Sequence, residues 1–249
     1  AGDILVFLPG EREIRECAIA IKKDIHLIQR FQPTIMALFA RQSVTEQERI
    51  FQPDNSRRIV LATNVAETSL TVPGIRFVID TGVARMKRYS YRNKVEQLHI
   101  EPIAQSAARQ RAGRCGRVAD GICVRLYSEE DFLARPVHTD PEILRSSLAA
   151  VILKMASLKL SRINEFPFLQ APQGRAISDG IQLLEELGAV ESEETNLGRG
   201  VRLTAIGIEI AQLPLDPRVG RILLAAKDQH ALREVLIIAT ALAILDPRE

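Results

Sequence analysis

Four short, mainly apolar runs constrain the fold of this 249-residue chain more than any other feature; they lie at 4–8, 34–39, 58–62 and 75–80. Strands that are buried on both faces have this pattern. Helical patterns at 11–23 and 45–51 separate them, and Thr45 with Glu48 three residues later fits a capping box for the second helix. Because strands that alternate with helices need crossover connections, the sequence predicts an α/β lobe with a parallel sheet covered by helices.

Polar residues and glycines follow three of these runs directly. They are Gly10 after the first run, Thr63 and Asn64 after the third, and Asp80 at the end of the fourth with Thr81 and Gly82 after it. The carboxyl ends of parallel strands share one edge of a sheet, and open α/β sheets bind their ligands at that edge. We therefore expect the functional site of the lobe there.

Residues 85–101 depart from the strand–helix alternation. Apolar and polar residues alternate on both sides of a basic tip that contains Arg92 and Lys94, which predicts a hairpin. The two cations could hold phosphate groups, while Tyr89 and Tyr91 offer aromatic faces on which bases could stack. The alternative is a solvated hairpin that packs its tyrosines on the body of the protein.

An arginine-rich octamer, Gln110-Arg-Ala-Gly-Arg-Cys-Gly-Arg117, follows the hairpin. A guanidinium group is always charged, and its planar donors fit phosphate oxygens. Arg114 and Arg117 are three residues apart, so on a helix they would point the same way and could hold one polyphosphate together. The alternative for an arginine-rich stretch is a solvated basic end of a helix.

The positive charge of the chain is concentrated in one window. Residues 85–125 contain ten Lys and Arg and three acids, a net charge of +7, whereas the whole chain carries +2. This asymmetry indicates a polyanionic partner, either a nucleotide or a nucleic acid. The three cysteines and four histidines lack metal-ligand spacing, so we expect no metal site and a reduced, cytoplasmic protein. No apolar run is long enough to cross a membrane, and we expect no membrane partner.

The rest of the chain, from residue 136, has a different organisation. Helices are predicted at 141–157 and 176–187, and short strands at 189–191 and 201–203. This order predicts a mainly α winged-helix domain at 136–203, after the α/β lobe at 1–135. The helix that would contact nucleic acid carries three acids and no base between 177 and 187, so we interpret this domain as a scaffold.

Three further helical patterns predict the start of a helical bundle at 204–249; they lie at 204–213, 216–227 and 231–245. Asp216-Pro217 is a favourable helix start. The chain opens on Ala1 and enters an apolar strand at once, and it stops soon after its last helix. We therefore expect a piece of a longer protein, with sequence missing upstream and an incomplete last domain.

With these segments in place, the chain resembles the DEAH-box ATP-dependent RNA helicases of superfamily 2, closest in pattern to the bacterial HrpA type. Four motifs in order carry the resemblance, which covers the whole chain; they are Leu5–Gly10, Thr63–Thr71, Val78–Gly82 and Gln110–Arg117. The resemblance implies a second RecA-like lobe, then a winged-helix domain, then the start of a helical-bundle (ratchet) domain.

The resemblance also implies a nucleotide site. Arg114 and Arg117 match the two arginine fingers of the family, which reach the phosphates of ATP, and Gln110 matches the glutamine that places the attacking water. Asp80 and Gly82 match positions at the nucleotide-facing strand end. A sixth residue, Phe51, matches the aromatic that stacks on the base.

A second set of residues would grip RNA according to the same resemblance. Gly10, Thr63, Asn64 and Thr68 match the residues that hold the nucleic-acid backbone; contacts of this kind position a strand without reading its sequence. The hairpin at 85–101, with Arg92 and Lys94, resembles a hook-like element beside the RNA. Single-stranded RNA is therefore the expected partner, with DNA possible.

Two motifs of the family are absent from the sequence. No glycine is followed by lysine, so there is no Gly-Lys-Ser/Thr phosphate loop, and no aspartate is followed by glutamate, so the Mg²⁺-binding Asp-Glu-Ala-His box is missing. In the family both lie on the first RecA-like lobe. The resemblance thus implies half of a split site that uses ATP with Mg²⁺, the upstream lobe of the same parent chain as a partner, and no activity of this piece alone.

Two other functions remain open at this point. One is a catalytically idle nucleic-acid-binding or regulatory module, against which the complete set of Gln110, Arg114 and Arg117 argues. The other is a DNA helicase of the same superfamily, since only contacts to the 2′-hydroxyl distinguish RNA from DNA. We expect the protein to be a monomer.

Overall fold

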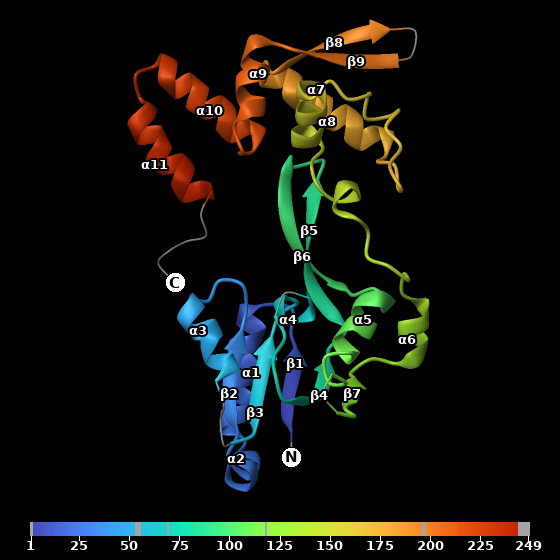
Figure 1. Ribbon diagram of the computed structural model, residues 1–249, viewed down its shortest axis with the longest axis vertical. Helices are drawn as coiled ribbons and strands as arrows, with labels where there is room; N and C mark the ends of the chain where they lie inside the picture. The colour runs from blue at the N-terminus through green and yellow to red at the C-terminus, as the bar shows by residue number, and fades with distance from the viewer. Residues whose placement is uncertain (1, 53–55, 69, 118, 196–197, 244–249) are drawn as a thin grey trace. The chain divides into compact units, whose positions relative to one another are not determined.

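The computed structural model describes residues 2–52, 56–68, 70–117, 119–195 and 198–243 (Figure 1). The chain forms two compact units. The first unit comprises Ala1–Met86 and Leu98–Thr139, and the second comprises Lys87–Gln97 and Asp140–Glu249. Three parts of the predictions lie outside the described residues, namely Ser69 of the second motif, residues 196–197 of the wing and residues 244–245 of the last helix.

A five-stranded, all-parallel sheet forms the centre of the first unit, in the order β2-β3-β1-β4-β7. Its strands are β1 (Asp3–Phe7), β2 (Thr34–Leu38), β3 (Arg58–Ala62), β4 (Ile75–Asp80) and β7 (Ile122–Arg125). Phe7 lies opposite Ala62 on one side and Asp80 on the other, so three strands end in register. The predicted α/β class with a parallel sheet is confirmed, because these apolar runs need cover on both faces.

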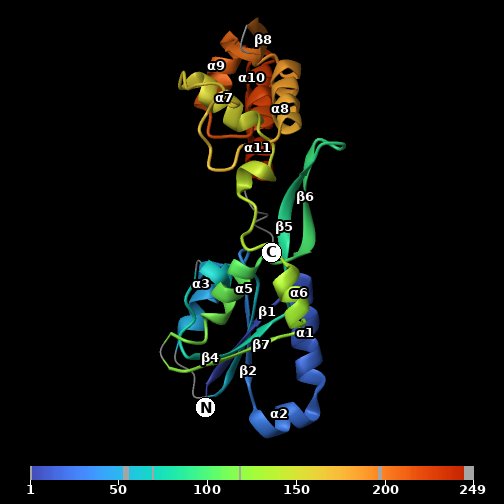
Figure 2. The ribbon, with the colours of Figure 1, turned by 90° about the vertical axis from the view of Figure 1, so that its right-hand side faces the viewer.

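Helices cover the two faces of this sheet. They are α1 (Glu11–Lys23), α2 (Ile25–Phe31), α3 (Val44–Glu48), the 3₁₀ turn η1 (Arg49–Phe51), α4 (Val65–Thr68), α5 (Gln105–Ala112) and α6 (Glu129–Ala134). Figure 2 shows α1 and α2 on one side of the sheet and α3 and α5 on the other. Ile14 of α1 packs with Val6 and Leu61, whereas Ile50 of η1 and Cys115 belong to the apolar cluster on the opposite face.

The predicted capping box of the helix after β2 was wrong. Ser43 is the N-cap of α3: its hydroxyl accepts the Glu46 N–H, and the Glu46 carboxylate accepts the Ser43 N–H. The same spacing of three fits Ser43–Glu46 and Thr45–Glu48, and only the backbone decides between them, because an N-cap residue must lie before the helical turn. Sequence analysis also missed α2, which Asp24 caps through the Leu27 N–H.

One apolar core holds most of the second unit together. Its elements are η2 (Glu142–Leu144), α7 (Ala149–Ser157), α8 (Gly174–Glu186), β8 (Val190–Thr195), β9 (Gly198–Leu203), α9 (Ala205–Gln212), α10 (Pro217–Asp228) and α11 (Leu232–Ala243). β8 and β9 pair antiparallel, as a hairpin does. Ile152 of α7, Leu184 of α8 and Ile210 of α9 are buried in the same core. The predicted division at 203/204 stays a prediction, although α9 packs together with α7 and α8.

The predicted helix at 141–157 was wrong in its first half. Residues 142–144 form only the turn η2, and α7 starts at Ala149. The apolar spacing is helical throughout, but the Arg145 carbonyl accepts the Tyr89 N–H instead of a helical partner. Two serines then precede α7, and the Ser147 hydroxyl accepts the Ala149 N–H. Serine side chains that bond nearby backbone groups compete in this way with a helix.

A separate two-stranded sheet is formed by β5 (Val83–Ser90) and β6 (Val95–Pro102), and a turn at 91–94 joins them. This hairpin is the one predicted at 85–101. Its tip, residues 87–97, groups with the second unit, while its base belongs to the first. In the part of the chain that the structure describes, no helix combines the length and the apolar character needed to span a membrane.

Candidate functional site at the carboxyl edge of the sheet

The octamer Gln110–Arg117 lies across the end of α5. Gln110 and Arg111 are on the last turn of the helix, which ends at Ala112 and has Gly113 as its C-cap. Arg114 and Arg117 lie in the loop that follows, residues 113–117, which we call the arginine loop. The prediction that these two arginines share one face of a helix was therefore wrong. The Gly113 N–H still makes the helical bond to the Arg109 carbonyl, but the Arg114 N–H bonds the Arg111 carbonyl, three residues back, so the chain turns out of the helix there.

The arginine loop nevertheless brings two positive charges close together. One Nη atom of Arg114 donates to the Glu67 carbonyl, and its other Nη is buried without a hydrogen-bond partner among the described residues. Burial, and then the charge of Arg117, lower the pKa of the Arg114 guanidinium. Arg117 is exposed and donates to the Thr71 hydroxyl at 2.6 Å. An unsatisfied buried donor beside a second cation is an arrangement that suits an anion.

Arg111, on the last turn of α5, has a different environment. Its side chain is 0% exposed and is the largest fully buried side chain of the described residues. It donates to the carboxylates of Asp80 at 2.7 Å and Glu67 at 3.1 Å, and to the Val83 carbonyl at 3.2 and 3.3 Å. Its guanidinium carbon lies 4.7 Å from the centre of the Phe7 ring. Arg111 therefore cannot contact a phosphate in this conformation.

Asp80 and Gly82, predicted at the nucleotide-facing strand end, are both buried. The Asp80 carboxylate, 0% exposed, accepts from Arg111, from the Gly82 N–H at 2.9 Å and from the Tyr127 hydroxyl at 2.9 Å. Burial, then Asp80, raise the pKa of Tyr127. Gly82 has φ +76°, and a Cβ there would come within 2.5 Å of the Tyr127 ring. The two residues therefore fix the backbone at the end of β4 and hold Arg111.

The predicted RNA-binding residues lie at the ends of adjacent strands. Gly10 follows β1, and Thr63 and Asn64 lead from β3 into α4. The Leu8 N–H bonds the Ala62 carbonyl at 2.8 Å, which holds these two strand ends together. Asn64 and Thr68, at the two ends of α4, are exposed. The structure thus gathers small polar side chains along one stretch of the carboxyl edge.

Gly10 is also tightly enclosed. Arg85 and Glu13 form an ion pair at 3.5 Å beside it, and a Cβ on Gly10 would come within 2.8 Å of both side chains. The backbone of Gly10 is extended, with φ −163°, which any residue can adopt, so a side chain here would only have to displace the ends of Arg85 and Glu13.

Phe51 is exposed at the end of η1. Its side chain is 42% exposed, whereas that of the preceding Ile50 is 1% exposed and packs on the sheet. Because Ile50 shares its apolar cluster with Cys115 of the arginine loop, Phe51 and the arginine loop lie over the same face of the sheet. An exposed aromatic ring there is available for stacking on a planar ligand.

The tip of the β5–β6 hairpin is anchored to the second unit. Lys94, at φ +55°, pairs with Asp179 of α8, and its carbonyl accepts from Arg218 of α10 at 2.8 Å. Tyr89 is 8% exposed and lies edge-on to Tyr91, which packs against the apolar core. The expectation that both tyrosines offer stacking faces was therefore wrong. Arg92 is exposed at the tip.

Glu67 is the residue of this site that sequence analysis missed. It lies inside the motif Thr63–Thr71, but no local signal indicated that its carboxylate would meet Arg111 and its carbonyl Arg114. Burial raises the pKa of Glu67, and the charge of Arg111 opposes that effect. Among the described residues, no three Asp, Glu, His or Cys side chains cluster in a way that could hold a metal ion.

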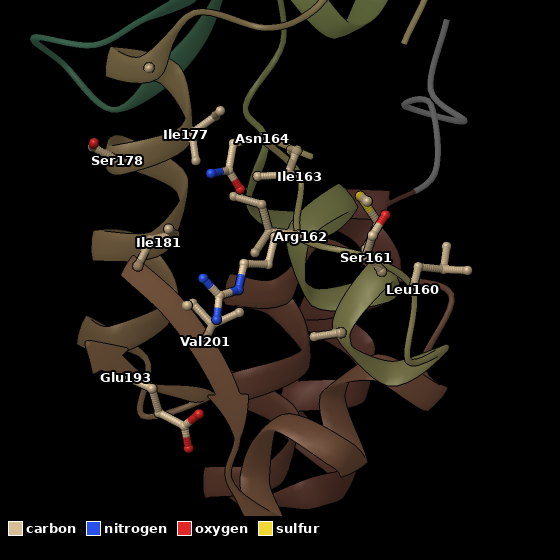
Figure 3. Close-up of a pocket in the computed structure, with 15 residues that line it drawn as sticks. Leu160, Ser161, Arg162, Ile163, Asn164, Ile177, Ser178, Ile181, Glu193 and Val201 are labelled. Atoms are coloured by element: carbon tan, nitrogen blue, oxygen red, sulfur yellow. The ribbon is translucent and has the colours of Figure 1, made fainter. Parts of the chain in front are cut away.

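The second unit contains a cavity of ≈ 310 Å³, which Figure 3 shows between α7, α8 and β9. Ile152, Ile163 and Ile181 form part of its wall, and Arg162 and Glu193 supply opposite charges. None of the predicted site residues lines it. The predicted site is therefore not in this cavity but at the carboxyl edge of the sheet.

The chain is similar to known helicases. The family described as "Helicase conserved C-terminal domain" matches residues 1–119. The chain is 56% identical over 248 residues to the ATP-dependent RNA helicase HrpA of Escherichia coli K12, and 57% identical over 249 residues to the HrpA homolog of Haemophilus influenzae. These alignments cover 100% of this chain and 19% of each relative, so the chain spans about a fifth of their length.

A solved structure has the same fold. The crystal structure of the Escherichia coli DEAH/RHA helicase HrpB matches with a TM-score of 0.85 at 32% sequence identity, over 100% of this chain and 30% of that one. The resemblance drawn from the four motifs is thus confirmed by full-length sequence identity, by a matching domain family and by a shared fold. The chain belongs to the DEAH-box helicases of superfamily 2.

Proposed function

We propose that this chain is the part of an ATP-dependent RNA helicase that supplies the arginine fingers and half of the grip on the RNA backbone. It would work with a first RecA-like lobe that carries the phosphate loop and the Mg²⁺-binding acids; we call this combination the two-lobe enzyme. The observation that carries the proposal is the buried Nη1 of Arg114, which lies beside a second arginine and has no hydrogen-bond partner in the part of the chain that the structure describes. The matching relatives are ATP-dependent RNA helicases by name.

The arginine loop would act on the phosphates of ATP. Arg114 and Arg117 would stabilise the negative charge that develops on the transferred phosphoryl group, and Gln110, exposed on the last turn of α5, would orient the attacking water. Phe51 would stack on the base. Two arginines do not fit a cation, so Mg²⁺ would be held by the other lobe.

Asp80 and Gly82 would contribute indirectly. Because Asp80 is fully buried and bonded to Arg111, Gly82 and Tyr127, we assign it to positioning the end of β4 rather than to a direct nucleotide contact. Gly82 allows the turn that this arrangement needs. Both residues would thereby support the nucleotide site without touching ATP.

The backbone of single-stranded RNA would lie along Gly10, Thr63, Asn64 and Thr68. Exposed hydroxyl and amide groups, together with backbone N–H groups at strand ends, suit phosphate and sugar contacts. Such contacts hold a strand in place without reading its bases. Two lobes that grip the strand in turn as the nucleotide site opens and closes would move the enzyme along RNA.

ATP turnover by this chain, alone and after mixing with a separately made first lobe, tests the proposal. The chain alone should hydrolyse no ATP, with or without single-stranded RNA, because it has no phosphate loop. Mixing should restore RNA-stimulated turnover. As a matched control, the first lobe should be mixed with an Arg114→Ala, Arg117→Ala chain, which should not restore it. Turnover by the chain alone would contradict the split site.

The hairpin tip allows a second prediction, since its two cations differ in environment. Arg92→Ala should lower RNA affinity and reduce the slope of log K against log salt by about 0.7, the value for one lost phosphate contact on a single strand. Lys94→Ala should instead lower the stability of the second unit by about 1 kcal/mol, because it removes the partner of Asp179. Fluorescence anisotropy with labelled RNA over a salt series and urea unfolding measure the two effects; a reduced slope for Lys94→Ala alone would contradict this assignment.

A further inference from the structure

Arg111 has no role in the function proposed above, although it lies in the same octamer as both fingers. It is fully buried, and three of its contacts come from three different elements: Glu67 on α4, Asp80 on β4 and the Val83 carbonyl on β5. A guanidinium group at the meeting point of these elements fixes them relative to one another. The question is whether it holds only the fold or also sets the geometry of the arginine loop.

Glu67 connects Arg111 to a finger. Its carboxylate accepts from the Nε of Arg111 at 3.1 Å, and its backbone carbonyl accepts from Arg114. The position of Glu67 therefore depends on Arg111. It in turn determines the position of the carbonyl that accepts the hydrogen bond of Arg114. Glu67 also lies on the single turn of α4, between Asn64 and Thr68 at its ends.

The geometry of Arg111 suits this task better than its charge alone would. Its Nε and Nη atoms bond Glu67, Asp80 and Val83, while its planar face stacks over Phe7. A lysine at this position would keep the positive charge but could not make these contacts together. Arg111→Lys therefore alters the placement of Glu67 while it keeps the positive charge.

We infer that Arg111 is a positioning residue: through Glu67 it sets the place of Arg114, and it thereby links the RNA-contacting turn α4 to the arginine loop. This inference rests on the proposed function, because it gives Arg111 its effect through a finger. The buried ion pairs at Arg111 are the physical link, since a buried guanidinium that bonds both carboxylates transmits a displacement of α4 to the end of α5.

A double-mutant cycle in the two-lobe enzyme tests the inference. The four proteins are the wild type, Arg111→Lys, Arg114→Ala and the double variant, each measured for kcat and for the KM of ATP with saturating single-stranded RNA. Arg111→Lys should lower kcat by about 10–100-fold with a nearly unchanged KM, as expected for a misplaced group that acts in the transition state. In the Arg114→Ala background the same substitution should change kcat by less than about twofold, because the finger through which it acts is gone.

Arg58→Lys is the matched control. Arg58 is a second buried arginine of this sheet; it pairs with Asp3 at the opposite, amino-terminal ends of the strands, with N–O distances of 2.8 and 2.6 Å. The Arg58→Lys substitution should lower the melting temperature, as Arg111→Lys does, but it should leave kcat unchanged. If Arg111→Lys does not fold, Glu67→Gln replaces it in the same cycle with Arg114→Ala. This substitution removes the charge that Arg111 bonds and keeps the backbone carbonyl that Arg114 bonds.

Two outcomes would overturn the inference, and they are distinguishable. In the first, Arg114→Ala lowers kcat, and Arg111→Lys lowers kcat by the same factor in the wild type and in the Arg114→Ala variant. Arg111 is then merely structural, and the proposed function stands. If Arg114→Ala itself leaves kcat unchanged, the finger role fails and the inference fails with it. A loss of kcat on Arg111→Lys that disappears in the Arg114→Ala background supports the inference.

Discussion

Arg117→Ala should lower the RNA-stimulated ATPase rate of the two-lobe enzyme by about 10³–10⁵-fold, the contribution of an arginine finger to phosphoryl transfer. Arg117 is exposed, and among the described residues its side chain donates to the Thr71 hydroxyl. Its guanidinium group can therefore reach a ligand without disturbing the core. Because the charge of a transferred phosphoryl group is stabilised mainly in the transition state, the loss should appear in kcat more than in the KM of ATP.

Binding and stability are the controls for this result. RNA affinity, measured by fluorescence anisotropy, should stay within about threefold of the wild type, because backbone contacts lie elsewhere along the sheet edge. Arg12→Ala, which removes an exposed arginine that pairs with Glu16 on α1, should leave turnover unchanged. Parallel loss of ATPase and RNA binding in Arg117→Ala would show that Arg117 is a backbone contact and not a finger.

The alanine substitution of Arg111, six residues earlier, should affect stability rather than a ligand contact. Arg111→Ala should lower the free energy of unfolding of this chain by about 3–5 kcal/mol, because removing one partner of a buried ion pair leaves an uncompensated charge. Here two carboxylates, Asp80 and Glu67, would lose their common cation, and the Phe7 ring would lose its stacked neighbour. Urea unfolding followed by circular dichroism measures the change.

Arg117→Ala is the matched control for this experiment, since it removes the same side chain from the same octamer. Its free energy of unfolding should lie within about 0.5 kcal/mol of the wild type, as for most exposed positions. Similar stabilities for the two variants would contradict the buried network. The pair of experiments thus separates an arginine that holds the fold from one that is free to act on a ligand.

The class of the fold could be predicted from the sequence because its signal is repeated. Continuous apolar runs such as 59–62 and 77–79 leave no polar face, and only a sheet covered on both sides buries them. Signals that depend on one or two residues were less reliable. The helical spacing at 141–157 did not reveal that Arg145 bonds Tyr89, a residue more than fifty positions earlier in the chain.

The location of the candidate site could be predicted from the sequence, but the different environments of its residues could not. Polar residues at strand ends indicated the carboxyl edge, and the structure gathers Gly10, Thr63 and Asn64 there. The three arginines of the octamer are chemically identical in the sequence, and only tertiary contacts show that Arg111 is buried while Arg117 is exposed. The position of Asp80 within its motif likewise gave no sign that its carboxylate faces inward.

The brevity of α4 has a consequence for its motion. Its four residues form a single turn, held by bonds from the Ala66 N–H to Thr63 and from the Glu67 N–H to Asn64. One turn of helix does not persist by itself, because nucleation costs more than so few bonds return. The amide hydrogens of α4 should therefore exchange with solvent whenever the contacts of Glu67 open, long before the sheet unfolds. A ligand that rests on this turn would slow that exchange and leave the amides of β3 unaffected.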